Sequence, residues 1–273
     1  MIICKHFPDK TFATKEEVFA ELRENADKII AVKKIPVSKS INTQVTFLNK
    51  EVDTVKVGPQ MKEGFCYPVI NTTKYMDSHD DVHFDGIWNK SIKEQQGKLF
   101  YVADHTVSID NVIAWPEDVN ASVKSVPWSF IGEKFDGNTE ALIFEIDKSK
   151  IVHPKALQII NEKRRVQNSV RMQYVKIKLA MNSDAKDDVE YKSYFDARVN
   201  DIANKDVAME QGYFFGIEEA KIVTEGSMVI FGSNGATPIR QKNEDAGDTT
   251  SEIIEPPVLA LKTVTQFINP NLI

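Results

Sequence analysis

The sequence predicts an α+β protein that is mainly β: a closed or partly closed β-barrel flanked by helices, with a small N-terminal β-α-β addition. Short runs of apolar and β-branched residues recur through the chain, and glycine, proline, asparagine and aspartate lie between them. Many short strands separated by turn-forming residues are typical of a barrel or a sandwich. The chain has 273 residues, of which 42% are hydrophobic and 27% charged, so it is long enough to bury a substantial core.

Residues 1–50 are predicted to form the N-terminal addition. Thr14 is a favourable helix N-cap, and Glu17 three residues later completes a capping box. The apolar residues that follow are spaced along one helix face: Val18, Phe19, Leu22 and Ala26. Residues 29–32 are all apolar and are expected to form a short strand that ends before two lysines and a proline.

Residues 51–240 are predicted to form the barrel domain. A helix is expected from Pro154 to about Arg165, because proline suits the first helical turn and a basic trio suits the last one. Strands are expected at several apolar runs, the first of which lies just before this range: residues 45–48, 67–71, 99–103, 112–115 and 142–146.

The clearest strand pattern is at residues 167–179. Apolar residues alternate up to Tyr174 and then alternate on the other parity from Val175, which predicts a β-bulge between these two residues. In the first half Ser169, Arg171 and Gln173 share a face. A hydroxyl, a guanidinium and an amide on one face are suited to a nucleophile and an oxyanion, although a strand with a polar outer face has the same pattern.

The remainder of the chain divides into three parts. A weakly amphipathic helical insertion is expected near residues 182–210, and two strands follow at 213–223 and 226–231. Residues 241–273 form the last predicted part. It begins with an acidic linker that cannot bury enough surface to fold alone, and it ends in an apolar segment that could dock on a partner or on the same protein.

Charge and cysteine content exclude several classes of protein. A net charge of −6 and a pI of about 5.5 argue against binding to nucleic acid. The two cysteines, Cys4 and Cys66, are not spaced as a disulfide framework or a zinc knuckle, which favours a reducing intracellular setting. The N-terminus does not resemble a signal peptide, and no apolar run approaches the ~20 residues of a membrane span. We therefore expect no membrane partner, no cofactor and no metal.

An aspartate-rich stretch from Asp77 to Asp85 contains a possible metal-ligand pair. His79 and His83 are four residues apart, the spacing that puts two imidazoles on one face of a helix. Aspartate and serine are poor helix formers, however, and the glutamate of an HExxH motif is absent. We therefore favour a solvated turn closed by aspartate side chains.

Two further residues are candidates for catalysis. His105 follows an apolar strand, as a general base often does, although a structural, hydrogen-bonded histidine is the simpler interpretation. Glu225 lies between apolar strand residues, where a carboxylate is costly unless an imidazolium or a guanidinium pairs with it. An edge-strand glutamate that faces water is the alternative.

Four segments follow one another along the chain: residues 71–92, residues 104–114 with His105, residues 168–172 with Ser169, and residues 225–234, which begin with Glu225. In this order they resemble the entry motif, the histidine motif, the nucleophile strand and the last strand of the prohead, or head maturation, proteases of tailed bacteriophages. Asp80, Ala114 and Arg171 stand where the family usually has glycine. The resemblance covers roughly residues 66–240.

This resemblance implies a herpesvirus-protease-like fold and a serine endopeptidase. His105 would be the general base, Ser169 the nucleophile and Glu225 the acid that orients the imidazole, with Arg171 as a weaker candidate for binding the oxyanion. The implied substrates are the major capsid and scaffold proteins, inside the assembling prohead in the host cytoplasm. Self-association and self-cleavage are expected there as well, with residues 241–257 as a candidate region for the cleavage.

Two alternatives remain open at this point. The chain could be a catalytically inactive protease-fold protein that serves as a structural or scaffold-binding component of the capsid. It could also be a metal-dependent hydrolase that uses His79 and His83.

Overall fold

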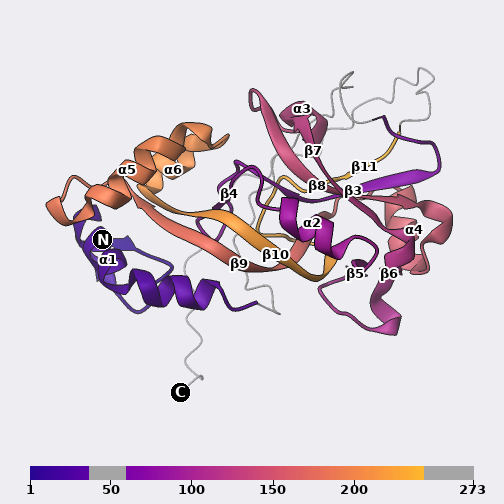
Figure 1. Ribbon diagram of the computed structural model, residues 1–273, viewed down its shortest axis with the longest axis horizontal. Helices are drawn as coiled ribbons and strands as arrows, with labels where there is room; N and C mark the ends of the chain where they lie inside the picture. Colours follow the sequence, from indigo (N-terminus) through magenta and orange to yellow (C-terminus); the bar gives the residue numbers. More distant parts are fainter. Residues whose placement is uncertain (37–59, 243–273) are drawn as a thin grey trace, which may run out of the picture. The chain divides into compact units, whose positions relative to one another are not determined.

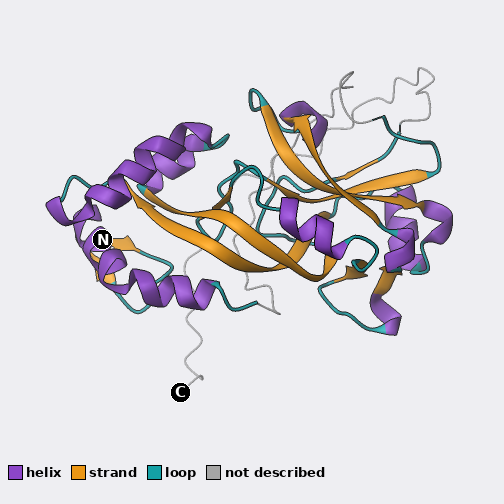
Figure 2. Ribbon diagram, viewed as in Figure 1, coloured by secondary structure: helices purple, strands orange, loops and turns teal. Residues whose placement is uncertain are grey.

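A computed structural model describes residues 1–36 and 60–242 and shows an α+β protein built mainly on two β-sheets (Figures 1 and 2). The expected coarse class is therefore confirmed. The described residues belong to one compact unit, Met1–Lys242. The expected strand at 45–48 and the segment beyond Lys242 lie outside the described residues. The strands are β1 (Ile2–Ile3), β2 (Thr11–Phe12), β3 (Phe65–Thr72), β4 (Asp81–His83), β5 (Phe100–Ala103), β6 (Val112–Ala114), β7 (Asn120–Pro127), β8 (Asn138–Asp147), β9 (Gln167–Met181), β10 (Tyr213–Val229) and β11 (Ile239–Arg240).

The first sheet is organised around β10, the longest strand (Figure 1). The first part of β10 pairs in parallel with β4, and its last part pairs in parallel with β5. On its other side β9 pairs antiparallel with almost its whole length, and β6 extends the sheet beyond β5. The end of β5 and the end of β10 therefore lie next to each other, with β9 on the far side of β10.

The second sheet is antiparallel, in the order β11-β3-β8-β7. The segment before β11 joins it to the first sheet. The backbone N–H of Asn168 in β9 donates to the carbonyl of Thr237 at 2.9 Å, and that of Val69 in β3 donates to the carbonyl of Pro238 at 2.9 Å. One short segment thus forms hydrogen bonds with an edge of each sheet.

The helices lie in the connections between strands. Their bounds are α1 (Lys15–Lys33), α2 (Asn89–Gln95), α3 (Trp128–Ile131), α4 (Pro154–Asn161), α5 (Val189–Arg198) and α6 (Lys205–Gln211). Helices α5 and α6 connect β9 to β10, which confirms the expected helical insertion, and Figure 1 shows both at one end of this strand pair. Within the described residues, none of the helices combines the length and apolar character that crossing a membrane requires.

Within the described residues 1–36, the N-terminal addition has the order β-β-α, so the strand predicted at 29–32, which completed the expected β-α-β order, is wrong. Thr14 caps the helix as expected, because the N–H of Glu17 donates to Thr14 Oγ1. The Glu17 carboxylate reaches one residue further back than in a standard capping box and accepts from the N–H of Ala13 at 2.7 Å. The helix then continues through residues 29–32, which were predicted to be a strand. The physical reason is that Leu22, Ala26 and residues 29–30 extend one helical stripe, which packs against the same core as the sheets.

Two other predicted boundaries differ from the structure. Helix α4 ends at Asn161, several residues before Arg165. The two strands expected at 213–223 and 226–231 are one strand, β10, interrupted by a bulge. Gly226, the first residue of the second expected strand, lies inside β10, where a Cβ would lie 2.8 Å from the Phe144 ring.

The predicted bulge in β9 is present. Tyr174 pairs with Ala220 and Lys176 pairs with Glu219, so Val175 is the extra residue. The change of apolar parity in the sequence therefore marks the bulge correctly.

Candidate functional site

His105 lies directly after β5, where the chain leaves the first sheet. The backbone N–H of Asp104 donates to the carbonyl of Met228 at the end of β10, at 3.0 Å, which holds this turn against β10. Both Asp104 and His105 have positive φ angles, 51° and 55°. Such a conformation is uncommon for residues other than glycine and persists only where surrounding contacts impose it.

Glu225 reaches the same place from β10. Three residues of β10, 223–225, lie opposite a single residue of β9, and Thr224 within this bulge has a φ of 71°. Glu225 is fully buried, and its Oε1 lies 2.7 Å from Nδ1 of His105. A carboxylate only accepts hydrogen bonds, so the N–H of the imidazole is on Nδ1 and Nε2 carries the lone pair. This is the tautomer that a general base requires.

Ser169 lies on β9 across from this pair. It is paired in register with Ser227 of β10. Directly opposite residues of an antiparallel pair project on the same face with Cβ atoms roughly 4.5–5.5 Å apart. Residues two apart on a strand also share a face, so Ser169, Arg171, Glu225 and Ser227 project together. Ser169 is half-buried.

The guanidinium of Arg171 contacts both members of the pair. Its Nη2 donates to the backbone carbonyl of His105 at 2.5 Å, and its Nε lies 3.5 Å from Oε1 of Glu225. The partner expected for a buried carboxylate is therefore present twice, as an imidazole and as a guanidinium. These contacts direct Arg171 toward His105 and Glu225, whereas the resemblance made it a weaker candidate for binding an oxyanion.

The structure thus joins three of the four predicted site residues by direct contacts: His105, Glu225 and Arg171. In the described parts of the chain, no hydrogen bond links Ser169 Oγ to His105. Ser169 is brought to the site by its position on the facing strand.

Ser227 is a site residue that the sequence analysis missed. Its Oγ donates to Oε2 of Glu225 at 2.8 Å and accepts the backbone N–H of His105 at 3.0 Å. The available signal was parity, because the residue two after Glu225 on one strand projects from the same face. A buried serine hydroxyl beside a buried carboxylate satisfies both groups.

The aspartate-rich stretch forms a turn, as favoured from the sequence. Oδ1 of Asp77 accepts from the backbone N–H of His79 at 2.8 Å and of Asp81 at 3.0 Å. Burial, followed by the nearby Asp81 charge, raises the pKa of Asp77 to about 6. The turn is buried and not solvated.

His83 has partners other than a metal. Its Nδ1 accepts from the side-chain amide of Asn71 at 3.0 Å, and Nε2 lies 3.3 Å from the hydroxyl of Tyr174. Burial lowers the pKa of His83 to about 4, so it is neutral at pH 7. Residues 1–36 and 60–242 hold no cluster of three or more histidine, cysteine, aspartate or glutamate side chains able to bind a metal ion. Neither observation supports the interpretation of His79 and His83 as a metal pair.

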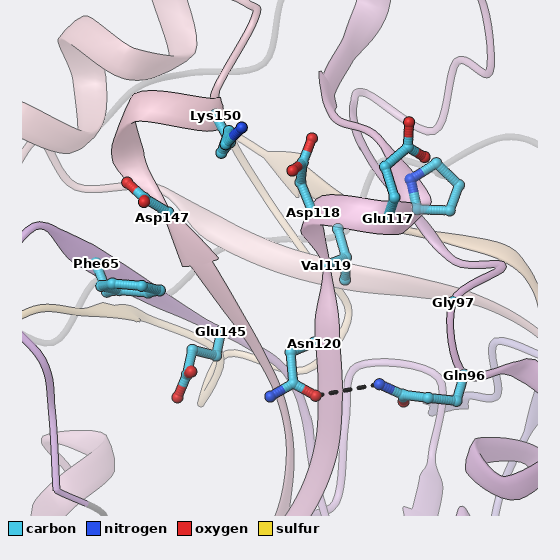
Figure 3. A pocket seen from close by; sticks show the side chains of 11 residues that line it. Phe65, Gln96, Gly97, Glu117, Asp118, Val119, Asn120, Glu145, Asp147 and Lys150 are labelled. Carbon is cyan, nitrogen blue, oxygen red and sulfur yellow. Dashed lines mark hydrogen bonds between the residues drawn. The ribbon is translucent and has the colours of Figure 1, made fainter.

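A surface hollow of about 400 Å³ lies elsewhere, between the start of β7 and the end of β8 (Figure 3). Four carboxylates and one lysine line it: Glu117, Asp118, Glu145, Asp147 and Lys150. None of the predicted site residues contributes to its wall. This hollow is therefore separate from the serine–histidine–glutamate arrangement.

Comparisons with protein-family models, with curated proteins and with solved structures find no match to this chain. The assignment of its site therefore depends on the local geometry and on the motifs in its own sequence.

Proposed function

We propose that this chain is a serine endopeptidase of the prohead-maturation type. The observation that carries the proposal is the 2.7 Å hydrogen bond between Nδ1 of His105 and the fully buried carboxylate of Glu225. It lies beside a strand on which Ser169 projects toward the same face. Residues separated by 120 positions in the sequence form this bond, in the order and roles that the motifs imply.

The mechanism follows from these positions. Glu225 holds the imidazole with its lone pair on Nε2 and stabilises the imidazolium that forms. His105 removes the proton of Ser169, whose oxygen attacks a peptide carbonyl. The imidazolium then gives this proton to the departing amine as the peptide C–N bond breaks, which leaves an acyl-enzyme. His105 next takes a proton from water, which hydrolyses the acyl-enzyme and restores the serine. Because Arg171 contacts His105 and Glu225, we assign it to orienting that pair. Backbone N–H groups near Arg171 are the candidates for binding the oxyanion.

We further infer that the two sheets form a partly closed barrel of the herpesvirus-protease type. The supporting observation is the segment around Thr237 and Pro238, which bonds to β9 on one side and to β3 on the other. The side chain of Asn168 also binds this segment, with Nδ2 donating to the carbonyl of Thr237 at 2.9 Å. Asn168 is adjacent to Ser169, so this junction fixes the backbone at the proposed nucleophile.

The substrates that we propose are the major capsid and scaffold proteins of a tailed phage. Cleavage would take place inside the assembling prohead in the host cytoplasm, where the enzyme would associate with further copies of itself. Residues 241–257 are the proposed self-cleavage region. The mechanism requires no cofactor, because the serine and the imidazole supply the nucleophile and the proton transfer.

Co-expression with a capsid protein tests the proposal. The intact masses of both chains are measured for the unmodified protein, for Ser169→Ala and for Ser125→Ala, which removes an exposed hydroxyl on β7. We expect cleavage in the first and third samples and none in the second. Identical, uncleaved masses in all three samples would refute the endopeptidase proposal.

The second candidate, a catalytically inactive capsid component, is favoured by one observation. No hydrogen bond joins Ser169 to His105 within the described residues, although such bonds are often long before substrate binds. A fluorophosphonate probe distinguishes the two candidates. Labelling of Ser169 that disappears in His105→Ala indicates an activated serine, and the absence of labelling supports the inactive component.

A further inference from the structure

We infer that Ser227 and Arg171 are positioning residues that fix the general base through its backbone, an inference that rests on the proposed serine-protease function. The observation is that both backbone polar groups of His105 are bound by side chains. Ser227 Oγ accepts its N–H at 3.0 Å, and Arg171 Nη2 donates to its carbonyl at 2.5 Å. The imidazole is held separately by Glu225.

The backbone of His105 requires this support. Two successive residues, Asp104 and His105, adopt positive φ angles. Residues other than glycine hold such angles only where neighbouring contacts impose them. With the N–H and the carbonyl both bound, the peptide planes on either side of His105 cannot rotate freely, and this fixes the direction of its side chain.

Ser227 also couples the base to the acid. The hydrogen bonds run from His105 N–H to Ser227 Oγ, from that hydroxyl to Oε2 of Glu225, and from Nδ1–H of His105 to Oε1. These three bonds form a closed ring, and each donor and acceptor in it is used in the only direction that the chemistry allows. Because Ser227 is fully buried, water cannot replace its hydroxyl without a rearrangement.

Few charged groups surround the imidazole in the described part of the chain. The described charged partners of His105 are Glu225 and Arg171, and Asp104 precedes it in the chain with its side chain exposed. Ser227 and Arg171 both contact the Glu225 carboxylate and the backbone of His105. Removing either one takes a partner from the carboxylate and a constraint from that backbone, so the imidazole is held less firmly against Oε1.

Nitrogen-15 NMR of the histidine side chains, recorded in the Ser169→Ala background, tests the inference without any need for activity. The chain has five histidines, so the ring signals can be assigned by substitution. We expect Ser227→Ala and Arg171→Gln each to change the tautomer signature of His105. Arg171→Lys keeps the charge and is expected to change this signature less.

A matched control separates positioning from general stability. Ser91 lies in α2, and its buried hydroxyl accepts a hydrogen bond from the backbone N–H of Ile222 at 2.8 Å. Ile222 is on β10, as Ser227 is, so Ser91→Ala removes a comparable hydroxyl next to the same strand but away from the site. With Ser169 restored, we expect Ser227→Ala to lower kcat by about 10- to 100-fold with little change in KM. The lost hydroxyl binds His105 and Glu225, so its removal affects the proton transfer and leaves the binding of substrate unchanged. Ser91→Ala should leave kcat and the His105 signals unchanged.

The outcomes distinguish the positioning inference from the protease proposal. If His105 signals in Ser227→Ala and Arg171→Gln match those in Ser91→Ala, the positioning inference is wrong, whether or not the chain cleaves a substrate. If the signals shift as expected but Ser169→Ala changes no product mass, the inference about geometry holds and the protease proposal fails.

Discussion

Replacing Lys33 with methionine is expected to destabilise the fold strongly. Lys33 ends helix α1, and its Nζ lies 2.5 Å from Oδ1 of Asp81, with side-chain exposures of 12% and 4%. The other oxygen of Asp81 accepts from the hydroxyl of Tyr174 at 2.8 Å. Methionine keeps the apolar stem of the lysine and removes its charge, so a buried carboxylate is left with one neutral donor. Breaking a buried pair in this way costs about 3–5 kcal/mol.

Urea unfolding at pH 7 measures this loss. The matched control is Lys10→Met, because Lys10 pairs with Glu21 at a comparable 2.7 Å but at the surface, with 55% of its side chain exposed. An exposed pair contributes about 0–1 kcal/mol, so Lys33→Met should lose several times more free energy of unfolding than Lys10→Met.

A second variant shows whether the lost charge pairing is the cause. Adding Asp81→Asn to Lys33→Met removes the buried charge and is expected to recover part of the stability. Equal losses for the Lys33 and Lys10 variants, or no recovery on adding Asp81→Asn, would contradict the view that α1 neutralises a buried charge of the sheet.

Three other predictions follow from buried groups. Gly226→Ala places a Cβ 2.8 Å from the Phe144 ring and is expected to cost about 1–3 kcal/mol in urea unfolding, whereas Gly235→Ala, whose Cβ has no neighbour closer than 3.6 Å, is expected to be nearly neutral. The pKa of Asp77 is raised from 3.8 to about 6, so the folded chain keeps a proton that the unfolded chain releases, and this stability is lost as the pH rises through 6. The stability of Asp77→Asn relative to the unmodified protein should therefore rise by on the order of 3 kcal/mol as the pH increases from 4 to 7. If the difference in free energy of unfolding between the two proteins stays constant over this range, the raised pKa of Asp77 is wrong. The pKa of His83 is lowered from 6.5 to about 4, so on acidification the unfolded chain binds a proton before the folded chain does. The free energy of unfolding therefore falls as the pH drops from 6.5 to 4. His83→Gln should make this fall smaller when unfolding is measured at the same series of pH values.

Local patterns in the sequence predicted the local structure well. The alternation of residues 167–179 gave strand β9, and its change of parity located the bulge at Val175. The capping box at Thr14 located the start of α1. Errors arose where one pattern fits two structures. The four apolar residues at 29–32 fit a strand as well as the end of a helical stripe, and only packing against the core decides between them.

The site was predictable only in part, because it depends on contacts distant in sequence. His105 and Glu225 were singled out from their places near apolar strands and from motif order, and the structure joins them by a hydrogen bond. Their pairing depends on β5 lying beside the last part of β10, a register that no local pattern specifies. Ser227 was missed for the same reason. Its role depends on the turn after β5, which brings the backbone of His105 to its hydroxyl.

The central position of β10 in the first sheet has a consequence for how the protein is made. Both parallel partners of β10 are synthesised more than a hundred residues earlier, and the ring around His105 needs Glu225 and Ser227 from its last part. During translation, His105 and the strand that carries Ser169 leave the ribosome well before Glu225 does. A nascent or truncated chain that ends before Val229 thus contains the proposed serine and histidine but lacks part or all of the strand that aligns them. Assembly of the site is therefore one of the last events of synthesis for the described part of the chain, and the order of translation itself delays the onset of any cleavage.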